Sequence, residues 1–248
     1  KIAYNRIMAD ISVVDILLAI VGGIFPTFLW LWFWYNQVER PQSRGFLSLL
    51  YIVGMIGVFI VIPIDSFILQ SGISQKEYLL AFALVEEVLK VVATAAIAFR
   101  SRMIQRPTDY TIFLVTMALG FSALENTLYL LQPISENNLT FILFTGNLRF
   151  IGATLLHTIC VAIVGNMLGI AFYENTLMKW VHGIFGLGIA IGLHAIFNYF
   201  ILLNTTRSIM IGLAGLWFIG ISVIVVFGRI QRFHLYHGQL SRDATLSS

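Results

Sequence analysis

The sequence predicts an all-α integral membrane protein that crosses the bilayer about seven times. Of its 248 residues, 58% are hydrophobic and only 11% are charged, and the mean hydropathy is +0.88. Soluble domains carry about 25% charged residues, so this composition is typical of a chain solvated by lipid. Crossing about 30 Å of hydrocarbon takes about 20 consecutive apolar residues. Seven such stretches follow one another, at 12–35, 46–69, 78–99, 110–131, 149–173, 181–203 and 208–229.

The segments between these stretches are too short to form a soluble domain. We therefore expect residues 1–248 to form a single transmembrane domain, with a polar cytoplasmic tail at 230–248. The cell membrane is the predicted location, and the lipid bilayer is the first predicted partner.

The basic residues indicate how the chain is oriented. Four lie in segments on one side of the membrane, at Lys1, Arg6, Lys76 and Arg207, with Arg149 near a boundary. Nine lie on the other side, at Arg40, Arg44, Arg100, Arg102, Arg106, Lys179, Arg229, Arg232 and Arg242. Because cytoplasmic segments carry the excess of Lys and Arg, the N-terminus is predicted outside and the C-terminus inside. The spread of these charges along the membrane boundaries argues against a nucleic-acid partner.

Several common catalytic classes lack their sequence signatures. Cys160 is the single cysteine, so an intramolecular disulfide is excluded, and we interpret it as a packing residue. No GxSxG, HExxH, DDxxD-type or Walker pattern occurs, which removes the usual support for a serine hydrolase, a zincin or an ATPase.

Ionisable side chains nevertheless lie inside four consecutive apolar stretches. Each charged residue in a span costs about 2.5–3.5 kcal/mol on insertion scales, and such residues normally face a protein interior or a functional cavity. One buried ion pair could have a purely structural role, but three glutamates and two histidines are more than such a role requires. The polar residues of these stretches are Glu86, Glu87, Lys90, Glu125, Asn126, Arg149, His157, His194 and Asn198.

Four of these side chains are predicted to lie at one depth. Counted from the extracytoplasmic end of each span, Glu86 lies about nine residues in, Glu125 about six, His157 about eight and His194 about nine. At 1.5 Å per residue, all four lie roughly 9–14 Å below the outer surface. The sequence therefore predicts one polar cavity shared by four helices.

The spacing of these residues along each helix indicates in which direction their side chains point. His194 and Asn198, four residues apart, project from one helix face. Glu86 and Glu87 are about 100° apart, so we expect one to face the cavity and the other to contact a neighbouring helix. Lys90 is one turn from both. Asp65, which follows Pro63 near the end of the second span, we interpret as structural or interfacial.

The ordered motifs on these spans resemble those of the PrsW family of intramembrane proteases. The similar segments are EEVLK at 86–90, GFSALEN at 120–126, Arg149 with Thr154 and His157, and HAIFN at 194–198. The wider group of CAAX prenyl endopeptidases and bacterial Abi proteins is also similar. That group has arginine one residue after the position of Lys90 and histidine in place of Glu125, so the PrsW branch is favoured and prenylated substrates are not.

The resemblance implies an endopeptidase that cleaves membrane-anchored proteins, such as an anti-sigma factor type of regulator, with residues 86–198 as a four-helix catalytic core. Two mechanisms stay open. In the mechanism without a metal, Glu86, helped by His157, deprotonates the water that attacks the peptide carbonyl. His194 and Asn198 then donate hydrogen bonds to the negative charge that develops on the carbonyl oxygen. With Zn²⁺, His157, His194 and a glutamate, Glu86 or Glu125, hold the ion. Supporting roles fall to Glu87, Lys90, Glu125, Asn126 and Arg149.

Two other functions use the same buried residues. A proton- or ion-coupled transporter would also bury glutamate, histidine and lysine at one depth, but it should show broken helices or a repeat. A catalytically inactive scaffold of the same fold should lack one of Glu86, His157, His194 or Asn198, and all four are present.

Overall fold

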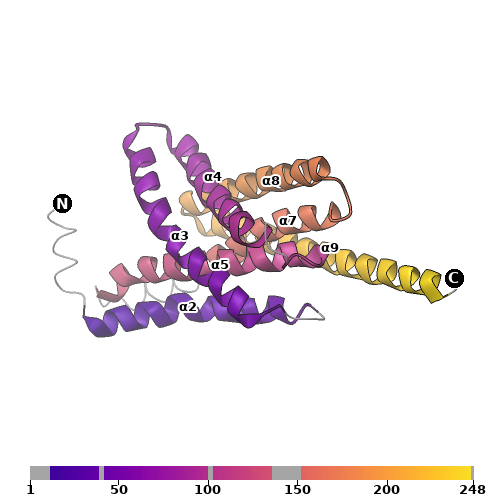
Figure 1. Cartoon of the computed structure of the whole chain (residues 1–248). Coiled ribbons are helices and arrows are strands. Elements are labelled where there is room, and N and C mark those ends of the chain that lie inside the picture. Colours follow the sequence, from indigo (N-terminus) through magenta and orange to yellow (C-terminus); the bar gives the residue numbers. More distant parts are fainter. Residues whose placement is uncertain (1–11, 39–41, 100–102, 136–151, 247–248) are drawn as a thin grey trace.

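The computed structural model describes residues 12–38, 42–99, 103–135 and 152–246, and every regular element in these ranges is helical (Figure 1). A short π-helix, η1 (Ala95–Phe99), continues the third helix. The α-helices are α2 (Val13–Tyr35), α3 (Arg44–Gln70), α4 (Gln75–Thr94), α5 (Pro107–Ser135), α7 (Thr154–Ile170), α8 (Thr176–Leu202) and α9 (Thr206–Leu246).

The predicted all-α membrane fold is confirmed, because each of the seven apolar stretches overlaps one of these α-helices. Five of them, α2, α3, α5, α8 and α9, are long and apolar enough to cross a membrane, and α7 is a shorter apolar helix. The apolar stretch of α4 is interrupted by its buried charges. Seven crossings and the orientation of the termini stay predictions.

Local sequence signals explain where the helices begin. In α4, the Ser74 hydroxyl accepts from the backbone N–H of Glu77, and the Glu77 carboxylate accepts in return from the backbone N–H of Ser74. This capping box satisfies amide groups that the first turn leaves unpaired. Ser12 and Asp15 form the same arrangement at the start of α2. The cap of α4 fixes the starting point of the helix that carries most of the buried charges.

Helix α5 is the centre of the bundle. In its candidate span 89% of the residues are buried, against 17% in that of α2. Figure 1 shows α2 running beside α5, α3 crossing both, and α4, α7 and α8 gathered on the other side. The outer faces of α2, α3, α8 and α9 carry exposed large apolar side chains, as lipid contact requires.

Glycines permit the closest of these helix crossings. A Cβ atom at Gly120 of α5 would overlap the backbone carbonyl of Tyr51 on α3, and one at Gly54 of α3 would overlap the carbonyl of Met117 on α5. Gly165 of α7 meets the backbone of Thr111 on α5 in the same way. Small residues of this kind let membrane helices approach backbone to backbone, where dispersion contacts are strongest.

Polar side chains link the same helices in their interior. Thr111 of α5 donates to the amide oxygen of Asn166 on α7 (3.0 Å), and the Asn166 amide nitrogen donates to the carbonyl of Val223 on α9 (3.0 Å). The hydroxyls of Thr27 on α2 and Tyr51 on α3 are 2.6 Å apart. The first two bonds link α5, α7 and α9 through Asn166, and the third links α2 to α3.

We predict that Gly120→Ala destabilises the protein, because the added methyl group meets a backbone carbonyl that cannot move without shifting α3. Overpacking of this kind costs about 1–3 kcal/mol. Unfolding by sodium dodecyl sulfate in mixed micelles measures the change. Gly188→Ala in α8 is the matched control, since a Cβ atom there meets nothing within 4 Å. Equal stability of the two variants would contradict the close crossing.

Candidate active site

The structure brings together the buried acids and histidines of α4, α7 and α8. One ligand atom from each of Glu86, Glu87, His157 and His194 lies within 4.8 Å of the others. All four residues are at most 2% exposed. The expectation that separate helices supply one polar cluster therefore agrees with the geometry.

As expected, one of the adjacent glutamates, Glu86, lines a cavity, and the other, Glu87, contacts His194 of the neighbouring helix α8. Their carboxylates nevertheless lie close together. The Oε2 atom of Glu86 and the Oε1 atom of Glu87 are each 3.8 Å from Nδ1 of His157. A glutamate side chain has three rotatable bonds, so two carboxylates that leave the helix about 100° apart can still converge. Both converge on the same cation, the ammonium group of Lys90.

Lys90 lies at the centre of the cluster. Its Nζ atom donates to Glu87 at 2.8 Å and to Glu86 at 3.3 Å, and it lies 2.7 Å from Nδ1 of His157. It also lies 4.5 Å from the centre of the Phe121 ring. Lys90, which is one helical turn from both glutamates, contacts both of them, and the shorter contact is with Glu87. One ammonium thus compensates two buried carboxylates and joins α4 to α7.

The contacts of His157 define its tautomer. An ammonium has no lone pair, so Nδ1 of His157 accepts a hydrogen bond from Lys90. The proton of a neutral ring is then on Nε2, which lies 2.8 Å from Oε2 of Glu125 and donates to it. Glu125, which is 13% exposed, therefore orients His157 from α5.

His194 has the opposite arrangement. Its Nδ1 atom lies 2.8 Å from Oε1 of Glu87, and because a carboxylate accepts, Nδ1 carries the proton. In a neutral ring Nε2 then has a lone pair, and it lies 4.0 Å from Oε2 of Glu86. Two basic atoms thus face each other across a gap that a water molecule or a cation can bridge.

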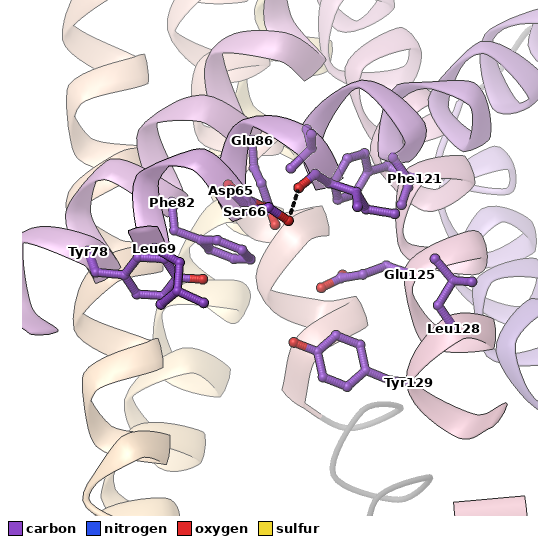
Figure 2. Close-up of a pocket in the computed structure, with 13 residues that line it drawn as sticks. Asp65, Ser66, Leu69, Tyr78, Phe82, Glu86, Phe121, Glu125, Leu128 and Tyr129 are labelled. Atoms are coloured by element: carbon purple, nitrogen blue, oxygen red, sulfur yellow. Dashed lines mark hydrogen bonds between the residues drawn. The ribbon is translucent and has the colours of Figure 1, made fainter. Parts of the chain in front are cut away.

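Two cavities adjoin this gap. The first, of about 390 Å³, lies between α3, α4 and α5 and is lined by Glu86 (Figure 2). The second, of about 290 Å³, is lined by His157, His194 and Asn198. Glu125 borders both, as do Tyr78, Phe82 and Tyr129.

The remaining predicted residues lie further out. Asn126 lines neither cavity among the described residues; its amide donates to Thr154 of α7 at 2.9 Å and to Ser122 at 3.4 Å. It therefore ties α5 to the first turn of α7. Arg149 lies outside the described residues. Cys160 is buried in the hydrophobic core, as its interpretation as a packing residue requires.

Sequence reasoning missed the aromatic walls of the cavities. Tyr78 and Phe82 precede Glu86 by eight and four residues, and Tyr129 follows Glu125 by four. Positions four apart share a helix face, so this spacing could have identified them. They did not stand out because aromatic residues are common throughout an apolar chain.

The donor set suits a metal ion. Two carboxylates and two imidazoles are ligands that divalent transition metals accept, and zinc in particular. The Oε2 atom of Glu87 is buried and has no hydrogen-bond partner among the described residues, so it is available to a further cation. The residues present therefore fit a divalent cation.

A buried cluster of glutamates and histidines, set beside cavities in a bundle of apolar helices, has the acid, base and ligand groups that an intramembrane protease needs, with or without a bound metal. Comparison with known proteins leads to the same class. Residues 42–227 match the family described as PrsW family intramembrane metalloprotease, and the chain belongs to this family. The predicted resemblance is thereby confirmed.

Two relatives carry the name Protease PrsW. The protein of Halalkalibacterium halodurans is 26% identical over 225 residues, which cover 86% of this chain and 98% of that protein. The protein of Shouchella clausii is 24% identical over 155 residues, which cover 59% of this chain and 67% of that protein. No solved structure matches the chain significantly.

We predict that Lys90→Met lowers the free energy of unfolding by about 3–5 kcal/mol, because it leaves two carboxylates buried without their shared cation. Adding Glu87→Gln should restore part of the loss, since it removes one of those charges. Unfolding in mixed micelles measures both effects. Lys76→Met, at an exposed position of the same helix, is the control and should change stability little. A double variant no more stable than Lys90→Met would contradict the shared-cation account.

Proposed function

We propose that the chain hydrolyses peptide bonds of membrane-anchored proteins at the Glu86, His157 and His194 cluster. The observation that carries the proposal is the 4.0 Å gap between Oε2 of Glu86 and Nε2 of His194. Both atoms are basic, and Glu86 and His194 line the two adjoining cavities. A water in this gap can contact both atoms while a peptide carbonyl approaches from the cavity side.

Glu86 is the proposed general base. Lys90 contacts its Oε2 atom at 3.3 Å, a longer distance than the 2.8 Å to Glu87, so Glu86 is the less tightly held of the two carboxylates. A general base needs a lone pair directed at the water and reach to take its proton. The proton can then pass to the leaving amine from the same carboxyl group.

Asn198 is the proposed donor to the carbonyl oxygen of the substrate. It lines the second cavity, and its amide can stabilise negative charge that develops on that oxygen. The sequence suggested His194 for the same role. With its proton on Nδ1, however, a neutral His194 has no proton on Nε2 to donate, so the geometry favours it as an acceptor or a ligand.

A divalent metal, with zinc as the candidate, would be held by donor atoms of Glu86, Glu87 and His194, and His157 would join them if its Nδ1 atom released Lys90. When bound, it supplies Lewis acid chemistry and lowers the pKa of a bound water. Glu125 then orients His157, and Lys90 restrains the two glutamates. Asn126 and Arg149 are proposed as supporting residues, and residues 86–198 as the catalytic core.

The two cavities support a protein substrate. They lie on either side of the shared residues Tyr78, Phe82, Glu125 and Tyr129, so side chains before and after the cleaved bond can occupy one cavity each. We propose a single-span protein of the cell membrane, such as an anti-sigma factor type of regulator, cleaved near its extracytoplasmic end.

We predict that Glu86→Gln lowers kcat for a single-span substrate by about 10²-fold or more, because the base loses its proton affinity. Asn198→Ala should lower kcat by about 10²–10³-fold, the usual effect of removing one oxyanion donor. Cys160→Ala is the control and should keep the activity. Purified protein and a panel of single-span substrates provide the measurement, and unchanged kcat in Glu86→Gln would reject the assigned base.

The same assay separates the two mechanisms when a strong chelator is added and the metal content is measured. Loss of activity with loss of one divalent ion per chain supports the metal form. The ion should also be missing from His194→Ala, whether or not a substrate is cleaved. Full activity in the metal-free protein would support the alternative without a metal.

We predict that Lys76 and the loop between α7 and α8 lie on opposite sides of the membrane, with Lys76 outside. In a Cys160→Ala background, Lys76→Cys should react with an impermeant maleimide added to intact cells. Glu174→Cys should react only after the membrane is opened. Both positions are exposed, so labelling reports the side of the membrane. The reverse pattern would invert the proposed orientation.

A further inference from the structure

The first cavity contains a carboxylate that the proposed mechanism does not use. Asp65 of α3 lines it together with Glu86 of α4 and Glu125 of α5. Figure 2 shows these three side chains around the same space, with the rings of Tyr78 and Tyr129 beside them. The sequence interpretation of Asp65 as structural or interfacial did not anticipate this position.

The contacts of Asp65 differ from those of a structural aspartate. Its Oδ1 atom is buried and has no hydrogen-bond partner in the part of the chain that the structure describes. Asp109, by contrast, accepts hydrogen bonds from the backbone N–H groups of Gln105 and Arg106 and from the amide of Gln42. A buried carboxylate oxygen without a donor is costly, and no hydrogen bond to Oδ1 of this partly buried residue offsets the cost among the described residues.

Acidic side chains of two helices, Asp65 of α3 and Glu86 of α4, lie on the wall of this cavity. No basic side chain is found among its described lining residues. Glu86 contacts the ammonium of Lys90, whereas no ion pair of Asp65 is found among the described residues. A cationic group that entered the cavity would compensate the charge of Asp65.

The rest of the wall suits a long side chain with a charged end. Tyr78, Phe82, Phe121 and Tyr129 supply ring surfaces, and the other lining residues are mostly aliphatic. Lysine and arginine bury their alkyl stems along such surfaces, and their charged ends interact favourably with aromatic rings.

We propose that this cavity is the subsite for a lysine or arginine side chain of the substrate near the cleaved bond, and that Asp65 is its counter-ion. The inference rests on the proposed function, since Glu86, the proposed base, lines the same cavity. Tyr78 lines this cavity together with Asp65 and Glu86 and also lines the second cavity, which joins the subsite to the reacting centre. Asp65 thus selects the substrate and does not take part in the proton transfers.

The test uses the purified full chain and a single-span substrate whose cleavage site has been mapped. Lysine, leucine or glutamate is placed in turn at each of the three residues on either side of the cleaved bond. At one position we expect lysine to give a kcat/KM about tenfold or more above that of leucine, as desolvated charge pairs do, with glutamate lowest.

The charge of Asp65 is then removed and reversed. In Asp65→Asn the lysine-to-leucine ratio should fall to about one, and in Asp65→Lys the preferred residue should become glutamate. Gln70→Ala, at an exposed position of the same helix outside the cavity lining, is the control and should keep the lysine preference. Asn keeps an acceptor oxygen, so a preference that survives in Asp65→Asn would mean that Asp65 binds a substrate N–H and would overturn the charge role.

A binding measurement makes the outcome independent of cleavage. In the Glu86→Gln background, the Kd values of the lysine and leucine peptides are compared in detergent, first with Asp65 intact and then with Asp65→Asn added. Tighter binding of lysine that requires Asp65 supports the subsite. Equal Kd values overturn it, even if no peptide is cleaved. Cleavage by the wild type with no preference at any position would overturn the subsite and leave the proposed function standing.

Discussion

The ammonium group of Lys90 is the interaction on which the rest of the site depends. Three carboxylates and two imidazoles lie together in an apolar bundle, and one cation contacts Glu86, Glu87 and His157. Without it, the two adjacent glutamates could not stay ionised side by side in a medium of low dielectric constant. Their positions in turn hold His194, and His157 is held between Lys90 and Glu125.

Such a cluster needs a rigid support, because its contacts extend over four helices. Helix α5 provides it. Glycines bring α3 and α7 into backbone contact with α5, and Asn166 joins α5, α7 and α9 by hydrogen bonds. Side chains that must stay within a few tenths of an ångström are best placed on helices held in this way. Asn126 contributes to the same support, because its hydrogen bond to Thr154 fixes the start of α7, the helix that carries His157.

Much of the fold was predictable because few backbone structures are stable in lipid. Backbone groups in hydrocarbon must pair within the segment, so each apolar stretch became a helix. The cluster of Glu86, His157 and His194 was predictable because charge is rare in spans and their depths agreed. The convergence of Glu87 was not, since helix geometry fixes the direction of Cβ and not the end of a long side chain. Asp65 was missed because its position on α3 gives no sign of which helix it will face.

The hydrogen bonds of the cluster form one unbroken line. From Glu125 they pass through both nitrogens of His157 to Lys90, on to Glu87, and through Nδ1 of His194, with each contact between 2.7 and 2.8 Å. The direction of donation changes along this line, because Lys90 donates to both His157 and Glu87, and Glu87 accepts from both Lys90 and His194. The line therefore does not relay protons from end to end; it couples the charges of its members through short contacts. The charge of Glu125 at the cavity rim thus influences His194 on the opposite helix, and replacing any one member changes the electrostatic environment of all the others.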